Sequence, residues 1–276
     1  MKLRKVTAAS AVVLALAVSV TACGGDKKDD ASGGKKIKIG IKFDQPGLGL
    51  QEPDGSYSGF DVDVATYVAK KLGYQPNQIE WVQTKSADRE NALKRGDVKF
   101  IAATYSITDE RKQKVDFAGP YLLAHQDLLV KKGSKITKGT DLNGKKLCSV
   151  TGSTSAQNVQ KTIAPKANLR ELSGYSECVA GLQSGAVDAL TTDDSILAGF
   201  AAQDKYKGQF QLAGLKLSNE NYGIGVKKGD SATVGKINKA LEQMVADKSW
   251  DKAVEKNFGP AQYKNEPAPK IGDIVK

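Results

Sequence analysis

The stretch FIAATYSITDER, residues 100–111, joins a short apolar segment to a helix start. Residues 100–103 predict a buried strand, Thr104 and Ser106 follow it, and Thr108 is a good helix N-cap. Arg111 then falls in the first turn, where its charge opposes the helix dipole. Free backbone N–H groups at a helix start, together with a planar guanidinium, favour a bound carboxylate. The alternative is that Arg111 pairs with a neighbouring acid or points to water.

Strand and helix patterns alternate on the N-terminal side of this stretch. Residues 37–41 predict a buried strand, and a helix over 88–94 that ends at Gly96 precedes a strand over 98–103. A further helix is predicted by four apolar residues at helical spacing, Phe60, Val64, Val68 and Leu72. This alternation predicts an α/β fold with a mainly parallel sheet.

The helix–glycine–strand pattern occurs a second time, 89 residues later. The repeated positions are Leu93, Gly96, Val98 and Ile101, which return as Leu182, Gly185, Val187 and Leu190. The same offset sets Asp193 against Thr104 and Ser195 against Ser106. Since open α/β sheets bind ligands at the carboxyl ends of their strands, two such ends predict a cleft. Chance similarity between two units of this kind is the alternative.

The N-terminal residues predict export. Three cations, Lys2, Arg4 and Lys5, precede an apolar run over 11–20 that is too short to span a bilayer, and small residues precede Cys23. Residues 1–22 are therefore a predicted signal peptide, and VTAC at 20–23 resembles a bacterial lipobox, after which Cys23 becomes the lipid-modified N-terminus. An ordinary secreted protein with an incidental cysteine is the alternative.

Two polar segments flank the predicted folded part. Residues 23–36 are mostly Gly, Lys, Asp and Ser and predict a lipidated flexible tether, because they cannot bury enough apolar surface to fold. Residues 261–276 are rich in Pro and Lys and predict a tail that wraps the surface.

Charge argues against nucleic acid as a partner. The formal net charge is +10, or +7 once Lys2, Arg4 and Lys5 leave with the signal peptide. The lysines are scattered singly and in pairs, without an arginine-rich arm or an aromatic-interleaved motif. A solvated basic surface is the better interpretation, and it attracts anionic ligands only weakly at ordinary salt.

Cys148 and Cys178 are the cysteines that remain besides Cys23. In an exported protein they most economically form one disulfide, and two buried free thiols are the alternative. With the lone His125 they lack the ligand spacing of a metal site. The sequence shows no nucleophile–base pair or phosphate loop, so no metal, no cofactor and no enzymatic activity is expected.

Three motifs together resemble the polar amino-acid-binding proteins of ABC importers: GFDVDVA at 59–65, TYSITDER at 104–111 and VDFAGPY at 115–121. The resemblance extends over about residues 37–258. Three further segments look like the glutamate-binding lipoproteins of actinobacterial uptake systems: FDQPG at 43–47, ATYS at 103–106 and CSVTGSTSA at 148–156.

The resemblance implies a two-lobed, type II periplasmic-binding-protein-like α/β fold with a ligand cleft between the lobes. Two crossover strands join them, near 124–128 and 216–221. Lobe 1 comprises residues 37–124 and 219–276, and lobe 2 comprises 125–218. His125 is then expected at the hinge, or else is an ordinary packing histidine.

The family pattern also implies roles for individual residues. Arg111 is the partner of the ligand α-carboxylate, assisted by Thr104 and Ser106, and Asp193 holds the α-ammonium group from the opposite lobe. These roles fit a zwitterion, because every desolvated charge needs a partner. The alternative for Asp193 is a helix N-cap ahead of Ser195.

Other residues are expected to close the cleft and to choose the ligand. Ser153 and Thr154 close over the carboxylate, with a helix cap as the alternative. Ser86 and Arg89 match a Ser-x-x-Arg segment that acidic-amino-acid-binding relatives use for the distal carboxylate, and the alternative for Arg89 is a solvated arginine on a helix face beside Glu90. Asp44 ends the first strand at the cleft mouth and is included as a ligand contact, but whether it or Lys42 points inward is open.

The resemblance implies a monomeric, extracytoplasmic lipoprotein, anchored to the outer face of the cytoplasmic membrane, that delivers L-glutamate to ABC permease subunits. Glutamine, aspartate and asparagine are alternative ligands. The alternative from a different class is an enzyme on the same fold, similar to the cyclohexadienyl dehydratases.

Overall fold

A nine-stranded mixed sheet is the centre of the computed structural model, which describes residues 35–276. Its strands follow the order β5-β1-β6-β12-β7-β10-β8-β9, with β11 paired to β7, and a small second sheet has the order β2-β3-β4. The strands are β1 (Ile37–Ile41), β2 (Asp44–Gln45), β3 (Gly49–Gln51), β4 (Tyr57–Ser58), β5 (Ile79–Gln83), β6 (Phe100–Ile101), β7 (Val115–Lys131), β8 (Lys146–Val150), β9 (Asn168–Leu172), β10 (Ala189–Asp193), β11 (Phe210–Leu212) and β12 (Asn219–Lys227). The helices are α1 (Phe60–Lys71), α2 (Arg89–Arg95), α3 (Asp109–Lys114), α4 (Thr154–Asn158), α5 (Tyr175–Ser184), α6 (Asp194–Ala202), α7 (Ser231–Ala246) and α8 (Ser249–Phe258).

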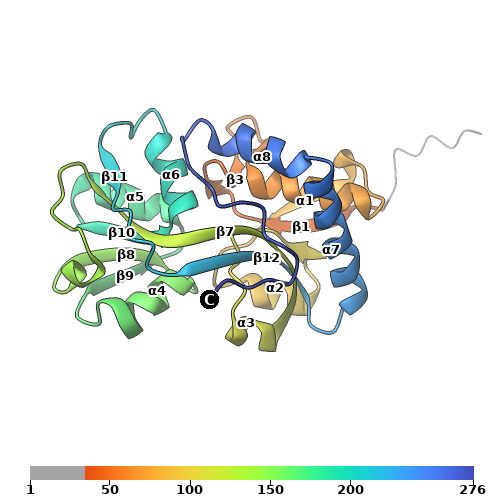
Figure 1. Ribbon diagram of the computed structural model, residues 1–276, viewed down its shortest axis with the longest axis horizontal. Helices are drawn as coiled ribbons and strands as arrows, with labels where there is room; N and C mark the ends of the chain where they lie inside the picture. The colour runs from red at the N-terminus through yellow and green to blue at the C-terminus, as the bar shows by residue number, and fades with distance from the viewer. Residues whose placement is uncertain (1–34) are drawn as a thin grey trace, which may run out of the picture. The chain divides into compact units, whose positions relative to one another are not determined.

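The large sheet has two parallel halves. In the first half β1 lies between β5 and β6, and in the second half β8 lies between β9 and β10. Strands β7 and β12 run side by side between the halves (Figure 1). Strand β7 pairs with β12 up to His125 and with β10 from Gln126 onward, so the crossing lies at these two residues. This is the two-lobed arrangement with two crossover strands. The lobe boundaries derived from the sequence stay a prediction.

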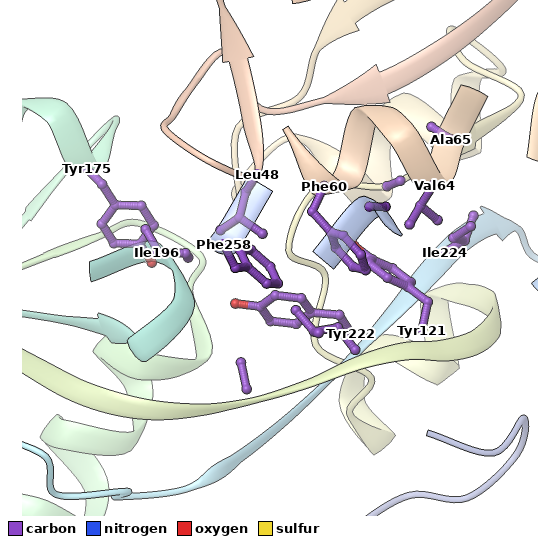
Figure 2. Packing of buried hydrophobic residues seen from close by; sticks show 14 of the residues in the cluster. Leu48, Phe60, Val64, Ala65, Tyr121, Tyr175, Ile196, Tyr222, Ile224 and Phe258 are labelled. Carbon is purple, nitrogen blue, oxygen red and sulfur yellow. The ribbon is translucent and has the colours of Figure 1, made fainter. Parts of the chain in front are cut away.

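An aromatic cluster holds the first half together. Phe60 of α1 packs edge-on against Trp250 of α8, with ring centroids 5.8 Å apart, and lies 6.2 Å from Tyr121 of β7. Figure 2 shows Phe60, Tyr121 and Tyr222 gathered between α1 and strands β7 and β12. The residue before this helix, Gly59, has a φ of 117°, and a Cβ there would lie 2.2 Å from a backbone oxygen. Only glycine fits the tight turn that starts α1.

The predicted elements are present with small differences. Helix α2 begins one residue after Asp88 and ends at Gly96, which has the left-handed conformation that often terminates helices. The strand predicted over 98–103 is limited to Phe100–Ile101 as β6. Three residues after its end, Thr104 has a φ of 46°, which is not an extended conformation.

Two predicted long-range features are confirmed. Cys148 of β8 and Cys178 of α5 form a disulfide with an S–S distance of 2.03 Å. The C-terminal tail lies across the crossover strands (Figure 1), where Gly272 N–H donates to the Gly119 carbonyl at 3.0 Å and Val275 N–H donates to the Asn221 side chain.

The predicted signal peptide, Cys23 and the tether up to residue 34 lie outside the described residues. Within residues 35–276, no helix combines the length and apolar character that crossing a membrane requires.

Candidate functional site

A small polar cavity lies between the two halves of the sheet. The first half and α3 contribute Ser86, Arg89, Thr104, Ser106 and Arg111, and the second half contributes Ser153, Thr154, Tyr175, Asp193 and Ile196. Eight of the nine predicted ligand contacts are thus brought together. Asp44 is the exception.

Arg111 reaches from one side of this cavity to the other. Its helix starts as predicted, because the Thr108 hydroxyl accepts the Arg111 backbone N–H at 3.2 Å. The guanidinium donates to the Ser106 carbonyl at 2.8 Å and, on the opposite side, to the Gly152 carbonyl at 2.9 Å. Only 8% of Arg111 is exposed. The side chain does not point to water, so that alternative is wrong. The other alternative, pairing with a neighbouring acid, holds in part, because Arg111 Nε lies 3.7 Å from Glu90 Oε1.

Arg89 is more deeply buried and less well paired. Its Nη1 donates to the carbonyls of Ala103 at 2.9 Å and Thr104 at 3.3 Å, whereas its buried Nε has no hydrogen-bond partner. Among residues 35–276 it forms no ion pair. Burial, and next the charge of Arg111, lower the pKa of Arg89 to about 10. The alternative of a solvated arginine on a helix face is wrong.

Asp193 faces these cations from the end of β10. It occupies the N-cap position of α6, but its side chain makes no capping bond. Its carboxylate accepts the Tyr222 hydroxyl at 2.5 Å and the Ser155 hydroxyl at 3.4 Å. Burial raises the pKa of the Asp193 carboxyl well above its usual range, and the nearby Glu220 raises it further. Two buried acids close together favour a cation beside them.

Three of the cavity hydroxyls have hydrogen-bond partners in the protein. Ser153 caps α4 by accepting the Ala156 backbone N–H at 3.1 Å, so the capping alternative holds for this residue. Thr154 donates instead to Glu220 at 2.9 Å. Thr104 donates to the Ala103 carbonyl at 2.8 Å.

The structure answers which residue after β1 points inward. The Lys42 ammonium group is buried and donates to the Ser86 hydroxyl at 2.8 Å. Burial, and next the charge of Arg89, lower the pKa of Lys42 well below its usual range. Asp44 turns away, and its carboxylate accepts the Ser176 backbone N–H at 3.3 Å at the cleft rim. Asp44 therefore bridges the two halves without lining the cavity.

Four residues of this site were not among the predicted contacts. Tyr175 and Ile196 line the cavity, Lys42 supports Ser86, and Glu220 supports Thr154. The signal for Lys42 was its place directly after a buried strand. Glu220 had no local signal, because it reaches the site on the returning crossover strand β12.

His125 lies at the crossing, where its ring contacts Asn219 at 2.9 Å and Glu266 at 3.0 Å. Its partners come from β12 and the tail, and its expected place at a hinge stays a prediction. In the part of the chain described, no three His, Cys, Asp or Glu side chains are grouped to hold a metal ion.

Comparison with known proteins extends this picture. The model of the bacterial extracellular solute-binding proteins, family 3, matches residues 37–260. The glutamate-binding protein GluB of Corynebacterium efficiens is 45% identical over 271 residues, which cover 93% of this chain and 91% of that protein. The glutamine-binding protein GlnH of Bacillus subtilis is 38% identical, over 92% of this chain and 97% of its own length.

A solved structure of an ancestral arginine-binding protein bound to arginine superposes with a TM-score of 0.75 at 37% identity. It covers 81% of this chain and 98% of its own. These three relatives are binding proteins rather than enzymes.

Proposed function

The chain belongs to family 3 of the bacterial extracellular solute-binding proteins, and we propose that it binds L-glutamate in the cavity between its two halves for uptake by an ABC importer. One observation carries this proposal: Arg89 and Arg111 are both buried at one cavity, while Asp193 faces it from the other side. Two cations and one anion match the charges of glutamate, which has two carboxylates and one ammonium group.

The orientation follows from how each charge is supported. The α-carboxylate binds Arg111, with Thr104, Ser106, Ser153 and Thr154 as hydroxyl partners. The α-ammonium group binds Asp193, whose raised pKa fits a carboxyl that is short of positive partners until the ligand arrives.

The distal carboxylate binds Arg89 and Ser86, with Lys42 behind Ser86. A carboxylate satisfies the unpartnered Nε of Arg89 and compensates a charge that forms no ion pair within residues 35–276. Glutamine could accept a hydrogen bond there but would leave the charge uncompensated, and aspartate and asparagine are one methylene shorter. Glutamine is therefore the second candidate ligand.

Calorimetric titration against all standard amino acids tests the proposal. Glutamate should bind most tightly, and tighter binding of glutamine or of a basic amino acid would contradict the side-chain assignment. The enzymatic alternative is tested on the same preparation with prephenate and arogenate. We expect no phenylpyruvate and no phenylalanine.

Anchoring is proposed from the sequence alone. Cys23 carries thioether-linked lipid, which holds a monomeric binder beside its permease on the outer face of the cytoplasmic membrane. Two acyl chains give durable anchoring where one does not. Cys23→Ala should release soluble protein or leave unprocessed precursor, whereas intact-mass data showing cleavage elsewhere without lipid would exclude anchoring.

A further inference from the structure

We propose that Tyr105 is a positioning residue for the two cavity arginines, and that it sets selectivity for ligands with an acidic rather than a neutral side chain. The inference rests on the proposed function. Tyr105 does not line the cavity, and it is fully buried behind it. Any effect of its side chain on the ligand is therefore indirect, through the residues that line the cavity.

Both guanidinium groups lie over the Tyr105 ring. The Arg89 Cζ is 4.0 Å from the ring centroid, and the Arg111 Cζ is 5.2 Å from it. The negative face of an aromatic ring attracts a cation most strongly where water is excluded, as it is here. The two arginines repel each other, since Arg111 contributes to lowering the pKa of Arg89. A ring shared by both guanidinium groups offsets part of that repulsion without introducing a negative charge.

The phenol hydroxyl of Tyr105 makes the charges of the two arginines unequally compensated. This hydroxyl donates to Glu90 Oε1 at 2.6 Å, and the same oxygen is 3.7 Å from Arg111 Nε. Tyr105 thereby holds a carboxylate within ion-pair distance of Arg111, whereas Arg89 forms no ion pair within residues 35–276 and feels the Glu90 charge only as a smaller contribution that raises its pKa. The less compensated charge is the one proposed to meet the ligand side chain, which favours an acid at that end.

The ring is fixed firmly enough to position its neighbours. Phe117 packs edge-on against it with centroids 4.8 Å apart. On strand β12, a Cβ at Gly225 would lie 2.7 Å from the ring, so a glycine leaves the space that Tyr105 fills. The tyrosine therefore has one well-defined place, and the guanidinium groups stack against a rigid surface.

Three variants test the inference by titration with glutamate and with glutamine. Tyr105→Phe keeps the ring but releases Glu90, so it should lower the preference for glutamate over glutamine by less than about fivefold, because the cation–π contacts remain. Tyr105→Leu removes the ring and should weaken glutamate about tenfold more than glutamine. Phe210→Leu is the control, since it also replaces a buried aromatic residue by leucine, on β11 and away from the cavity lining. It should leave the ratio of the two affinities unchanged.

Thermal unfolding of each variant measures the stability lost with the packing of the ring, so that this loss can be distinguished from an effect on the position of the arginines. If Tyr105→Leu does not fold, Tyr105→Met, which has a longer and more adaptable side chain, takes its place. Equal weakening of both ligands by the leucine or methionine variant, or the same change of ratio in Phe210→Leu, would overturn the inference. Failure of the wild-type protein to bind any amino acid would overturn the proposed function instead.

Discussion

The two halves of the sheet are built alike and carry opposite charges at the cavity. In the first, β1 lies between parallel strands β5 and β6, and in the second, β8 lies between β9 and β10. The helix before the last strand ends at a left-handed glycine in both, Gly96 and Gly185. Backbone bonds also match, since Lys99 N–H donates to the Lys38 carbonyl and Asp188 N–H donates to the Lys146 carbonyl.

The halves differ in the side chains that their strand ends and adjoining helices bring to the cavity. The first half and α3 bring Arg89 and Arg111, and the second half brings Asp193. A common backbone thus supplies two strand ends that face each other, while the side chains placed there divide the recognition of a zwitterion into a cationic side and an anionic side. Variants that remove one charge at a time test this division.

Arg111→Ala should have the largest effect. It removes the proposed partner of the α-carboxylate, which all amino acids share, and strands a buried charge of the ligand. We expect a loss of about 3–5 kcal/mol, or more than a hundredfold, for every amino acid tested by calorimetry. Lys112→Ala, on the exposed side of the same helix, is the control and should bind normally. Normal binding by Arg111→Ala would contradict the assignment of Arg111 to the ligand α-carboxylate.

Asp193→Asn should rank next, because an amide can still accept a hydrogen bond from the ammonium group without balancing its charge. Affinity for every amino acid should fall by about 2 kcal/mol or more. Since the pKa of Asp193 is raised, its carboxylate protonates at a higher pH than an ordinary one. Wild-type affinity should therefore decline on acidification, while the affinity of the variant stays flat over the same range. Parallel pH profiles would contradict this role.

Arg89→Ala should weaken the binding of acidic ligands more than that of neutral ones, without abolishing binding. Glutamate should weaken about a hundredfold, because its distal carboxylate loses a buried partner, whereas glutamine should change much less. Arg95→Ala, at the exposed end of the same helix, controls for helix propensity. Equal weakening of glutamate and glutamine binding would show that Arg89 does not recognise the side chain of the ligand.

The fold was predictable to the extent that local patterns determined it. Helical spacing located α1, and the strand-end rule predicted that Thr104 and Asp193 end two strands at one cleft, while the joint role of Arg111 and Asp193 came from the family resemblance. The rule succeeds because parallel strands bring their carboxyl ends to one edge whatever side chains they carry.

The residues whose roles the sequence did not predict share a physical cause. Lys42 and Asp44 follow the same strand, and the turn after it, rather than the strand period, decides which one points inward. Tyr105 has the pattern of a core residue, and its importance comes from two arginines that approach its ring from different helices. Glu220 arrives on a strand far away in sequence. Such convergence depends on tertiary packing and leaves no local trace.

The disulfide is a difference between the halves that should affect stability without affecting binding. It ties β8 to α5, and the sequence separation of 30 residues predicts a contribution of about 3–4 kcal/mol. Replacing both Cys148 and Cys178 by Ala should lower the urea midpoint accordingly. Glutamate affinity should be unchanged at moderate temperature, because neither cysteine lines the cavity. A matching loss of affinity would show that the link also shapes the site.

The smallest effect concerns the matched residues before β6 and β10. Lys99 forms an ion pair with Asp230 at 2.7 Å, whereas Asp188 accepts the Lys146 backbone N–H at 2.8 Å. Asp230 also caps α7 by accepting the Thr233 backbone N–H at 3.1 Å. Asp230→Ala should cost about 1 kcal/mol, mainly through the lost cap, since exposed ion pairs contribute little.

The pH dependence of unfolding identifies this contribution. Hydrogen bonds from Lys99 and then Thr233 lower the pKa of Asp230 in the folded protein to about 2, below the ordinary range of an aspartate. A carboxyl whose pKa is lowered by folding stabilises the protein above its unfolded pKa, and that stability is lost as the pH falls through the folded one. The difference between wild type and Asp230→Ala should therefore be constant near neutrality and shrink between about pH 4 and about pH 2. Lys99→Ala should retain most of the stability, because the cap remains. An equal loss in both variants would assign the effect to the ion pair instead.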